Sequence, residues 1–123
     1  MWTFKNFIND NGKDEIEEWK NNRTQEEQAS MDTFIRNLER MEKLTYPYVR
    51  QLKGFKEKIY ELRISVGKVE LRPLGCYGPQ RREFTLLVGS IEKNNKFEPK
   101  SAPSKAIERK RLIYDGRHTK DYE

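Results

Sequence analysis

The chain has 123 residues, of which 37% are charged and 34% are hydrophobic. This length predicts one domain spanning residues 1–123 with a modest core. The single cysteine, Cys76, excludes an intramolecular disulfide and a metal site built from thiolates. No basic start precedes an apolar run, and no stretch approaches the roughly 18 apolar residues of a membrane span. We therefore expect a cytoplasmic protein without a membrane partner.

The net charge of +5 is distributed unevenly along the chain. Residues 1–44 hold seven Lys and Arg against ten Asp and Glu, a net charge of −3. Residues 45–123 hold eighteen against ten, a net charge of +8. A basic segment of this kind favours contact with a polyanion such as nucleic acid. The alternative interpretation is a charged surface that is merely solvated.

The first predicted elements are a strand and two helices. Residues 2–8 are aromatic and nearly alternating, which predicts a strand. Acidic residues open a short helix over residues 14–21, and Thr24 with Glu27 forms a capping box before a longer helix. We expect that helix to run to about Leu44. Its apolar positions have the 3-and-4 spacing of a face packed on a sheet: Met31, Phe34, Ile35, Leu38, Met41 and Leu44.

A hairpin is predicted over residues 59–72, because apolar and polar residues alternate on both sides of a Gly67-Lys68 turn. Its apolar face should turn toward the long helix. The turn predicts three cross-strand pairs: Val66 with Val69, Ser65 with Glu70, and Ile64 with Leu71. The same register places Arg63 opposite Arg72 on the polar face, and like charges in that position repel each other.

Two interpretations of the Arg63–Arg72 pair remain open. In the first, the diagonal neighbours Glu61 or Glu70 neutralise the arginines, and the cluster is structural. In the second, an anion bridges both guanidinium groups, because the planar arginine fork matches phosphate oxygens at two points. The second interpretation is the working hypothesis.

A third strand is predicted at residues 84–91, where the nearly continuous apolar run is typical of a strand covered on both faces. We expect a loop at residues 75–79 before it. A polar turn at residues 92–96 and an irregular segment at residues 97–102 should follow it.

A C-terminal helix is predicted from Ala102, since Pro103 is tolerated in the first turn. Residues 45–58, which contain Pro47 and Gly54, read as a connector. Residues 114–123 read as a polar C-terminal tail. Strands and helices in this order predict an α+β fold.

Three segments together resemble the RelE/HigB/ParE superfamily of bacterial toxins, nearest its phage-derived HigB-like branch. Residues 52–54 (LKG) followed by residues 60–63 (YELR) are similar to the L-x-G-(x)-YELR signature, and Arg72 falls where the next strand of the family has an arginine. Residues 86–99, followed by a helix with Ala102 and Ala106, are similar to the segment after it. The resemblance implies a RelE-like fold: a small antiparallel-rich sheet packed on one side by an N-terminal helical pair, with a C-terminal helix.

The resemblance also implies a function, the toxin of a type II toxin–antitoxin system. Such a toxin is a ribosome-dependent mRNA endonuclease, held inactive by a cognate helix-turn-helix antitoxin. The chemistry needs no metal and no cofactor: the ribose 2′-hydroxyl attacks the adjacent phosphate and the 5′-oxygen leaves. The expected catalytic residues are Arg63, Arg72, Lys93, His118 and Tyr122. The expected RNA-binding residues are Lys68, Arg81, Arg82 and Lys96.

Two other functions stay open. The first is a non-catalytic RNA- or protein-binding module of a phage or mobile element. It is favoured by Glu92-Lys93, which stands where the family usually has two lysines. The second is a ParE-like gyrase poison, which would inhibit a protein target without cleaving RNA.

Overall fold

A six-stranded mixed sheet forms the centre of the structure, a computed structural model that describes residues 1–123. Its strands lie in the order β10 (Thr119–Asp121), β1 (Thr3–Phe7), β7 (Glu83–Val88), β6 (Leu74–Tyr77), β3 (Tyr60–Leu62) and β2 (Val49–Gln51). Only β1 and β7 run parallel, and every other neighbouring pair is antiparallel.

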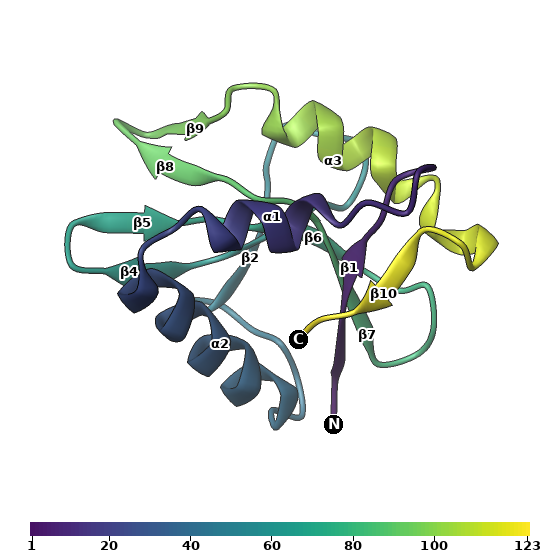
Figure 1. The fold of residues 1–123 in the computed structure, drawn as a ribbon, viewed down its shortest axis with the longest axis horizontal. Coiled ribbons are helices and arrows are strands. Elements are labelled where there is room, and N and C mark those ends of the chain that lie inside the picture. Colours follow the sequence, from purple (N-terminus) through teal and green to yellow (C-terminus); the bar gives the residue numbers. More distant parts are fainter.

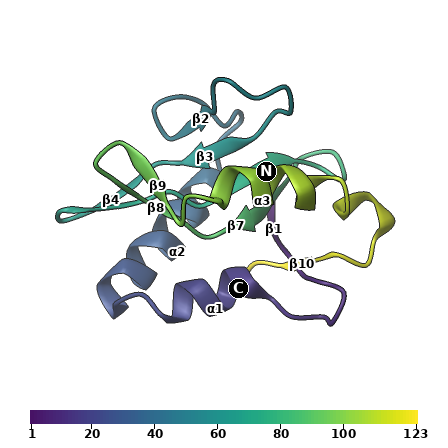
Figure 2. The same cartoon turned by 90° about the horizontal axis from the view of Figure 1, so that it is seen from above.

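Three chain segments pass from this sheet into a second, four-stranded antiparallel sheet. β3 leads through Arg63 into β4 (Ile64–Val66), β5 (Val69–Leu71) leads through Arg72 into β6, and β7 leads through Gly89 into β8 (Ile91–Lys93). β9 (Lys96–Glu98) completes the order β4-β5-β8-β9. The β4–β5 and β8–β9 hairpins therefore project together from one end of the molecule (Figure 1, Figure 2).

Two helices cover one face of the sheets and the third covers the other. α1 (Glu15–Asn21) and α2 (Gln25–Glu39) contribute to one core: Ile16, Met31, Ile35 and Leu38 pack with Ile64, Val66 and Leu71. α3 (Ala102–Lys110) packs on β6 and β7, and a short 3-10 helix, η1 (Ile113–Asp115), follows it. In Figure 1 the strands pass between α2 and α3. The fold is therefore α+β. None of its helices has the length and apolar character that a membrane span requires.

Local sequence signals explain where α1 and α2 begin and where the β4–β5 hairpin turns. The Asp14 side chain caps α1 by accepting from the Glu17 amide, and Thr24 with Glu27 forms the predicted capping box of α2. The hairpin register predicted through Gly67-Lys68 is confirmed, with the three pairs in place. The strand predicted at residues 84–91 and covered on both faces is confirmed for residues 84–88, all five of which are buried, but β7 ends at Val88 and Ile91 begins β8.

The helix predicted to reach Leu44 ends earlier, at Glu39. The carbonyl of Glu39 accepts a hydrogen bond of 2.8 Å from the Trp2 amide, and the Arg40 amide turns back to Asn37. The Trp2 amide thus occupies the Glu39 carbonyl, which would have to accept from a later helical amide if α2 continued. Leu44 is buried without being helical.

The loop predicted at residues 75–79 is wrong for its first part, because Leu74–Tyr77 is strand β6. Gly75 marks a close approach of two strands, since a Cβ there would lie 2.5 Å from Phe84 Cε1. Four further short strands lie in segments predicted largely as connector, polar turn, irregular segment and tail: Val49–Gln51, Ile91–Lys93, Lys96–Glu98 and Thr119–Asp121. Each is a strand through pairing with a neighbour, which a local pattern of three residues does not reveal.

Gly89 offers a test of the packing between α1 and the sheet. A Cβ at this position would overlap the Trp19 indole ring. Gly89→Ala should therefore lower the free energy of unfolding by about 1–3 kcal/mol. In a Trp19→Ala background the same substitution should cost less than about 0.5 kcal/mol, because the ring is gone. Urea unfolding of the four proteins measures both values, and equal costs in the two backgrounds would contradict this packing.

Candidate functional site

Glu61 lies in the middle of β3 and has no exposed surface. Its Oε2 atom pairs with Arg50 Nε and with Arg63 Nη1, each at 2.8 Å. Its Oε1 atom lies 4.0 Å from Arg72 Nε and accepts no hydrogen bond. Arg50 stands directly opposite Glu61 in β2, and Arg63 follows Glu61 by two residues, just after β3 ends. A buried carboxylate is stable only when it is paired with positive charge. The Glu61 carboxylate therefore holds the guanidinium groups of Arg50, Arg63 and Arg72 close to one another.

Arg72 is the most buried of these arginines, with 4% of its side chain exposed. Each guanidinium nitrogen has an acceptor: Nε pairs with Glu92 at 3.2 Å, Nη2 pairs with Glu70 at 2.9 Å, and Nη1 donates to the Leu71 carbonyl at 2.9 Å. The Ser65 hydroxyl and Arg72 hold the pKa of Glu70 below its usual range. This geometry is that of the first interpretation, in which protein carboxylates neutralise Arg72.

Arg63 is more accessible, with 26% of its side chain exposed. It contributes to two pockets, and Glu92 contributes to the same two. We call the first the cation pocket. It has a volume of about 310 Å³ and is lined by Arg50, Glu61, Arg63, Glu92, Asn95, Lys96 and Phe97. The second, of about 580 Å³, includes Tyr48, Glu70 and Arg72. Arg63 therefore combines an anchored guanidinium with access to solvent.

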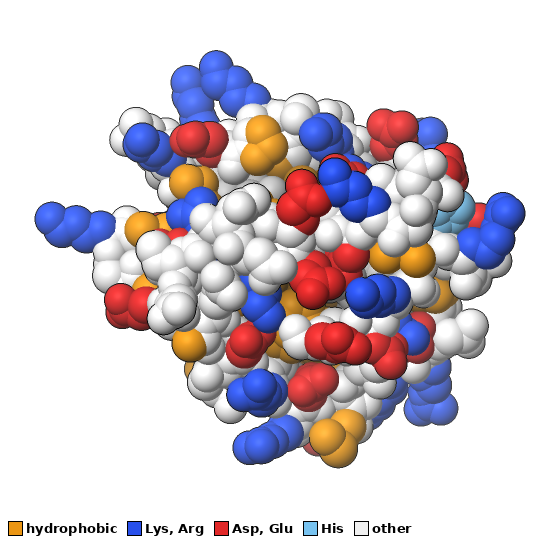
Figure 3. Space-filling view, in the orientation of Figure 1, with side chains coloured by type: hydrophobic (Ala, Val, Ile, Leu, Met, Phe, Trp, Pro, Cys, Tyr) orange, Lys and Arg blue, Asp and Glu red, His pale blue; other side chains and the backbone are white.

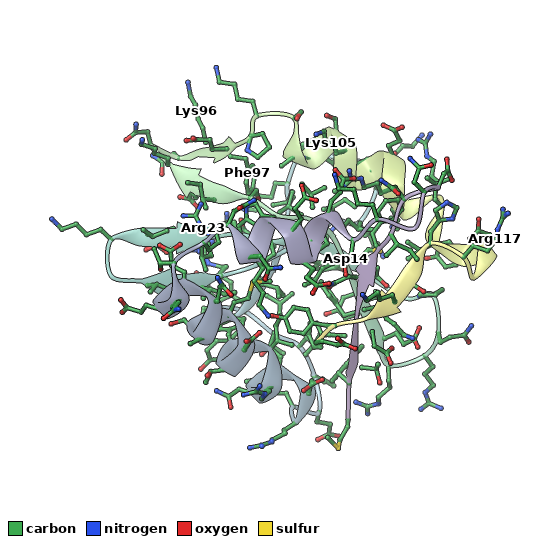
Figure 4. All side chains as sticks on the ribbon, viewed as in Figure 1. Asp14, Arg23, Lys96, Phe97, Lys105 and Arg117 are labelled. Carbon is green, nitrogen blue, oxygen red and sulfur yellow. The ribbon has the colours of Figure 1, made fainter.

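One wall of the cation pocket comes from the β8–β9 hairpin. Its turn residues, Asn94 and Asn95, have φ angles of 54° and 62°, and Lys93 pairs with Lys96 across the turn. Positive φ at both central positions is typical of a type I′ turn, which asparagine tolerates. Asn95 and Phe97 both line the pocket, and Phe97 lies beside Lys96 on β9 (Figure 4).

The predicted catalytic residues are not all brought together. Arg63 and Arg72 meet at Glu61, and exposed Lys93 ends β8 next to the cation pocket. His118 and Tyr122 lie at either end of β10, the opposite edge strand of the central sheet. β1, β7 and β6 separate β10 from β3. Figure 4 places Arg117, the neighbour of His118, at the far side of the molecule from Phe97.

His118 forms a clasp between two aspartates. Its Nε2 lies 2.7 Å from Asp10 Oδ1 and its Nδ1 lies 2.8 Å from Asp115 Oδ2, and the ring stacks on Phe7. The two carboxylates, Asp10 first, raise the pKa of His118. The Arg117 amide, with His118, lowers the pKa of Asp115 to about 2. Both ring nitrogens are thus engaged: Nε2 holds the C-terminal segment to the β1–α1 loop, and Nδ1 makes a contact within that segment.

Tyr122 is also engaged by the protein. Its hydroxyl donates to Asp32 at 2.6 Å, and Lys20 lies over its ring. Burial, with the Asp32 carboxylate, raises the pKa of Tyr122 above its usual range. Lys20 pairs with the same Asp32 oxygen at 2.5 Å. Figure 3 shows carboxylates and basic side chains interspersed around the middle of this face, over α1 and the C-terminal end of the chain.

The predicted RNA-binding residues are spread over three places. Lys96 lines the cation pocket, and Lys68 is exposed at the tip of the β4–β5 hairpin. Arg81 and Arg82 lie in the turn between β6 and β7. Arg82 donates to the Glu42 carbonyl at 2.8 Å and stacks on Trp2. Of the four, only Lys96 shares a pocket with Arg63.

Four residues of the cation pocket were missed from the sequence: Arg50, Glu92, Asn95 and Phe97. Arg50 belongs to a strand of three residues inside a predicted connector, so no local pattern marks it. The adjacent asparagines 94 and 95 are a signal for a type I′ turn and could have located the hairpin wall. The position of Glu92 opposite Glu70 depends on pairing between β5 and β8, which are distant in sequence.

Comparison with protein-family models, curated proteins and solved structures finds no match for this chain. No group of three or more His, Cys, Asp or Glu side chains is placed to hold a metal ion.

The different burial of Arg72 and Arg63 leads to a prediction about stability. Arg72→Ala should lower the free energy of unfolding by about 3–5 kcal/mol, because it removes a buried guanidinium that is the shared donor for Glu70, Glu92 and the Leu71 carbonyl. Arg63→Ala should cost less, about 1–2 kcal/mol, because Arg50 still pairs with the same oxygen of Glu61. Urea unfolding of both variants provides the measurement. A similar cost for the two would show that Arg63 is as structural as Arg72.

The His118 clasp predicts a pH dependence. Because the folded-state pKa of His118 is raised, its contribution is complete below the unfolded pKa of about 6.5 and is lost as pH rises through the folded value. The melting temperature should therefore fall from about pH 6 to pH 9 more steeply for the wild type than for His118→Gln. Parallel curves would mean that His118 does not contribute through its charge.

Proposed function

We propose that this chain is a RelE-like toxin that cleaves mRNA on the ribosome, with the cation pocket as its active site. The observation that carries the proposal is the grouping of Arg50, Arg63 and Lys96 around the accessible carboxylate of Glu92, which is 29% exposed. The element order also supports it: strand, two helices, a meander of β3, β6 and β7, and a C-terminal helix.

The chemistry follows from the pocket. Arg63 and Lys96 hold the scissile phosphate and stabilise the charge of its pentacoordinate transition state. Glu92 takes the proton of the ribose 2′-hydroxyl as the 2′-oxygen bonds to phosphorus. The bond to the 5′-oxygen breaks, and that oxygen takes a proton from water. Buried Glu61 positions Arg50 and Arg63 without touching RNA.

This assignment changes the catalytic set that the resemblance implies. Arg72 becomes a positioning residue that holds Glu92, and Lys93 adds positive charge at the rim. His118 and Tyr122 hold the C-terminal segment in place. The partners that go with the proposal are a ribosome carrying mRNA and a cognate helix-turn-helix antitoxin, in the cytoplasm.

A second candidate is a non-catalytic RNA- or protein-binding module. Two observations favour it: Arg72 has an acceptor for every guanidinium nitrogen, and His118 and Tyr122 lie at the opposite sheet edge. Such a module would use the same cation pocket to bind an anion, without proton transfer.

Induction of the chain in bacterial cells, followed by mapping of mRNA 5′ ends, tests the proposal. Wild type should arrest growth and create new 5′ ends within translated messages. Arg63→Ala and Glu92→Gln should remove them, since losing a transition-state cation or a general base costs about 10²-fold or more in rate. Arg111→Ala is the matched control, because Arg111 is exposed and lies outside the pocket.

The other functions give different results in the same experiment. Growth arrest with DNA damage and intact mRNA would contradict cleavage and indicate a gyrase poison. Expression of folded protein without any effect on growth would contradict both toxin functions and leave the binding module. Circular dichroism of each variant checks that loss of activity is not loss of folding.

A further inference from the structure

The strand β4 is an edge of the four-stranded sheet and pairs only with β5. A two-residue turn closes the hairpin after Val66, so the next pair, Ser65 with Glu70, is of the non-hydrogen-bonded kind. The N–H and C=O groups of Ser65 therefore point to the open edge. Natural sheets commonly block such an edge with charged residues. The edge strands β2, β9 and β10 carry them, whereas β4 has none.

A groove of about 410 Å³ lies between this edge and α2, the helix next to β4 in Figure 1. We call it the β4 groove. On α2 the stretch from Glu26 to Phe34 rises about 12 Å, which is the length of about four extended residues. The only charge in the groove is negative, so it favours a peptide over a phosphate backbone. Its lining residues are Glu26, Ala29, Ser30, Thr33, Phe34, Asn37, Ile64 and Ser65.

The β4 groove continues toward Arg63. It shares Phe34 and Ser65 with the pocket of about 580 Å³, which in turn shares Arg63 with the cation pocket. Arg63 donates to Glu61 through Nη1 alone, and its Nε and Nη2 atoms donate to no group of the protein. These donors match an incoming carboxylate. The path therefore has a carboxylate, Glu26, at one end and a guanidinium with free donors at the other.

We infer that the β4 groove binds an extended segment of a partner protein, which adds a strand to β4 and places an acidic side chain on Arg63. Hydrogen bonds with the Ser65 backbone hold the segment, as in other complexes formed by strand addition. Because side chains alternate along a strand, the segment has apolar residues toward α2 and places its acidic residue on the Ser65 side. This docking goes beyond the proposed function and needs no RNA. Only its consequence, exclusion of a phosphate from Arg63, rests on that function.

The test is binding of a fluorescein-labelled peptide, KTVTVET, to the full chain, measured by fluorescence anisotropy. Antiparallel to β4, its central threonine pairs with Ser65, its glutamate reaches Arg63 and its lysine lies toward Glu26. The control KTVPVET lacks the backbone N–H that pairs with Ser65, and the control KTVTVQT lacks the acidic group. Wild type should bind KTVTVET roughly 10-fold or more tightly than either control.

Two exposed positions of α2 provide matched variants of the protein. Ala29 lines the β4 groove, whereas Gln25 lies outside it. Ala29→Glu should weaken binding of KTVTVET roughly 10-fold or more, because the bound segment would cover an unpaired carboxylate. Gln25→Glu adds the same charge and should bind the peptide as wild type does. Circular dichroism checks that both variants fold.

Three results would overturn the docking site. The first is equal binding of the three peptides by wild type. The second is unchanged binding of KTVTVET by Ala29→Glu together with its loss in Arg63→Ala, since the peptide would then occupy the cation pocket alone. The third is a groove that carries RNA, in which Ala29→Glu weakens binding of oligouridine but not of the peptide. Selective peptide binding by a chain that cleaves no mRNA in cells would support the docking site and overturn only the proposed function.

Discussion

Glu61 is a carboxylate without exposed surface in the middle of a sheet, and a buried charge of this kind costs several kcal/mol unless it is paired. Arg50 supplies one ion pair from the neighbouring strand β2, and Arg63 supplies the other from the residue that follows β3. Arg72 lies on the other side and is itself satisfied by Glu70 and Glu92. Four strands, β2, β3, β5 and β8, therefore meet in one network of charges with Arg63 and Arg72, which lie between strands. Its members constrain one another more strongly than exposed ion pairs do.

The network lies where the two sheets join. The Arg72 amide donates to the Ser90 carbonyl at 2.8 Å, and the Ser90 hydroxyl donates back to the Arg72 carbonyl. Arg63 is the single residue between β3 and β4, and Arg72 lies with Pro73 between β5 and β6. Their side chains thus stand at a bend, where the polar face of the hairpins meets the central sheet. Because of this position, residues of the buried Glu61 cluster also line the open cation pocket.

The charged residues at the β10 edge of the central sheet stabilise the structure. At the opposite edge, His118 joins Asp10 to Asp115, and Lys20 with Asp32 fixes Tyr122. These contacts hold β10 on β1 and cover that edge of the sheet, which would otherwise offer unpaired backbone groups. The charged residues at the two ends of the molecule therefore have different roles. Those at the β10 edge stabilise the fold, whereas at the cation pocket Arg63 and Lys96 remain accessible.

Much of the site was predictable from local pattern. The Gly67-Lys68 hairpin, its register and the neighbourhood of Arg63, Arg72, Glu61 and Glu70 follow from alternation over consecutive residues. The burial of Glu61 was not predictable from this pattern. The same alternation assigns Glu61 to an open polar face, yet it is fully buried. Glu61 is buried by β2 and by arginines whose positions depend on other strands.

The sequence by itself determined the α+β class, the caps of α1 and α2, the central hairpin and the buried strand β7, because each depends on residues within a few positions of one another. Only the tertiary structure decided which charged residues share a pocket. Arg50, Glu92 and Phe97 join Arg63 through pairing between distant strands, and His118 is carried to the opposite edge by the same pairing. Side-chain chemistry is local, whereas proximity across a sheet is set by strand order and register.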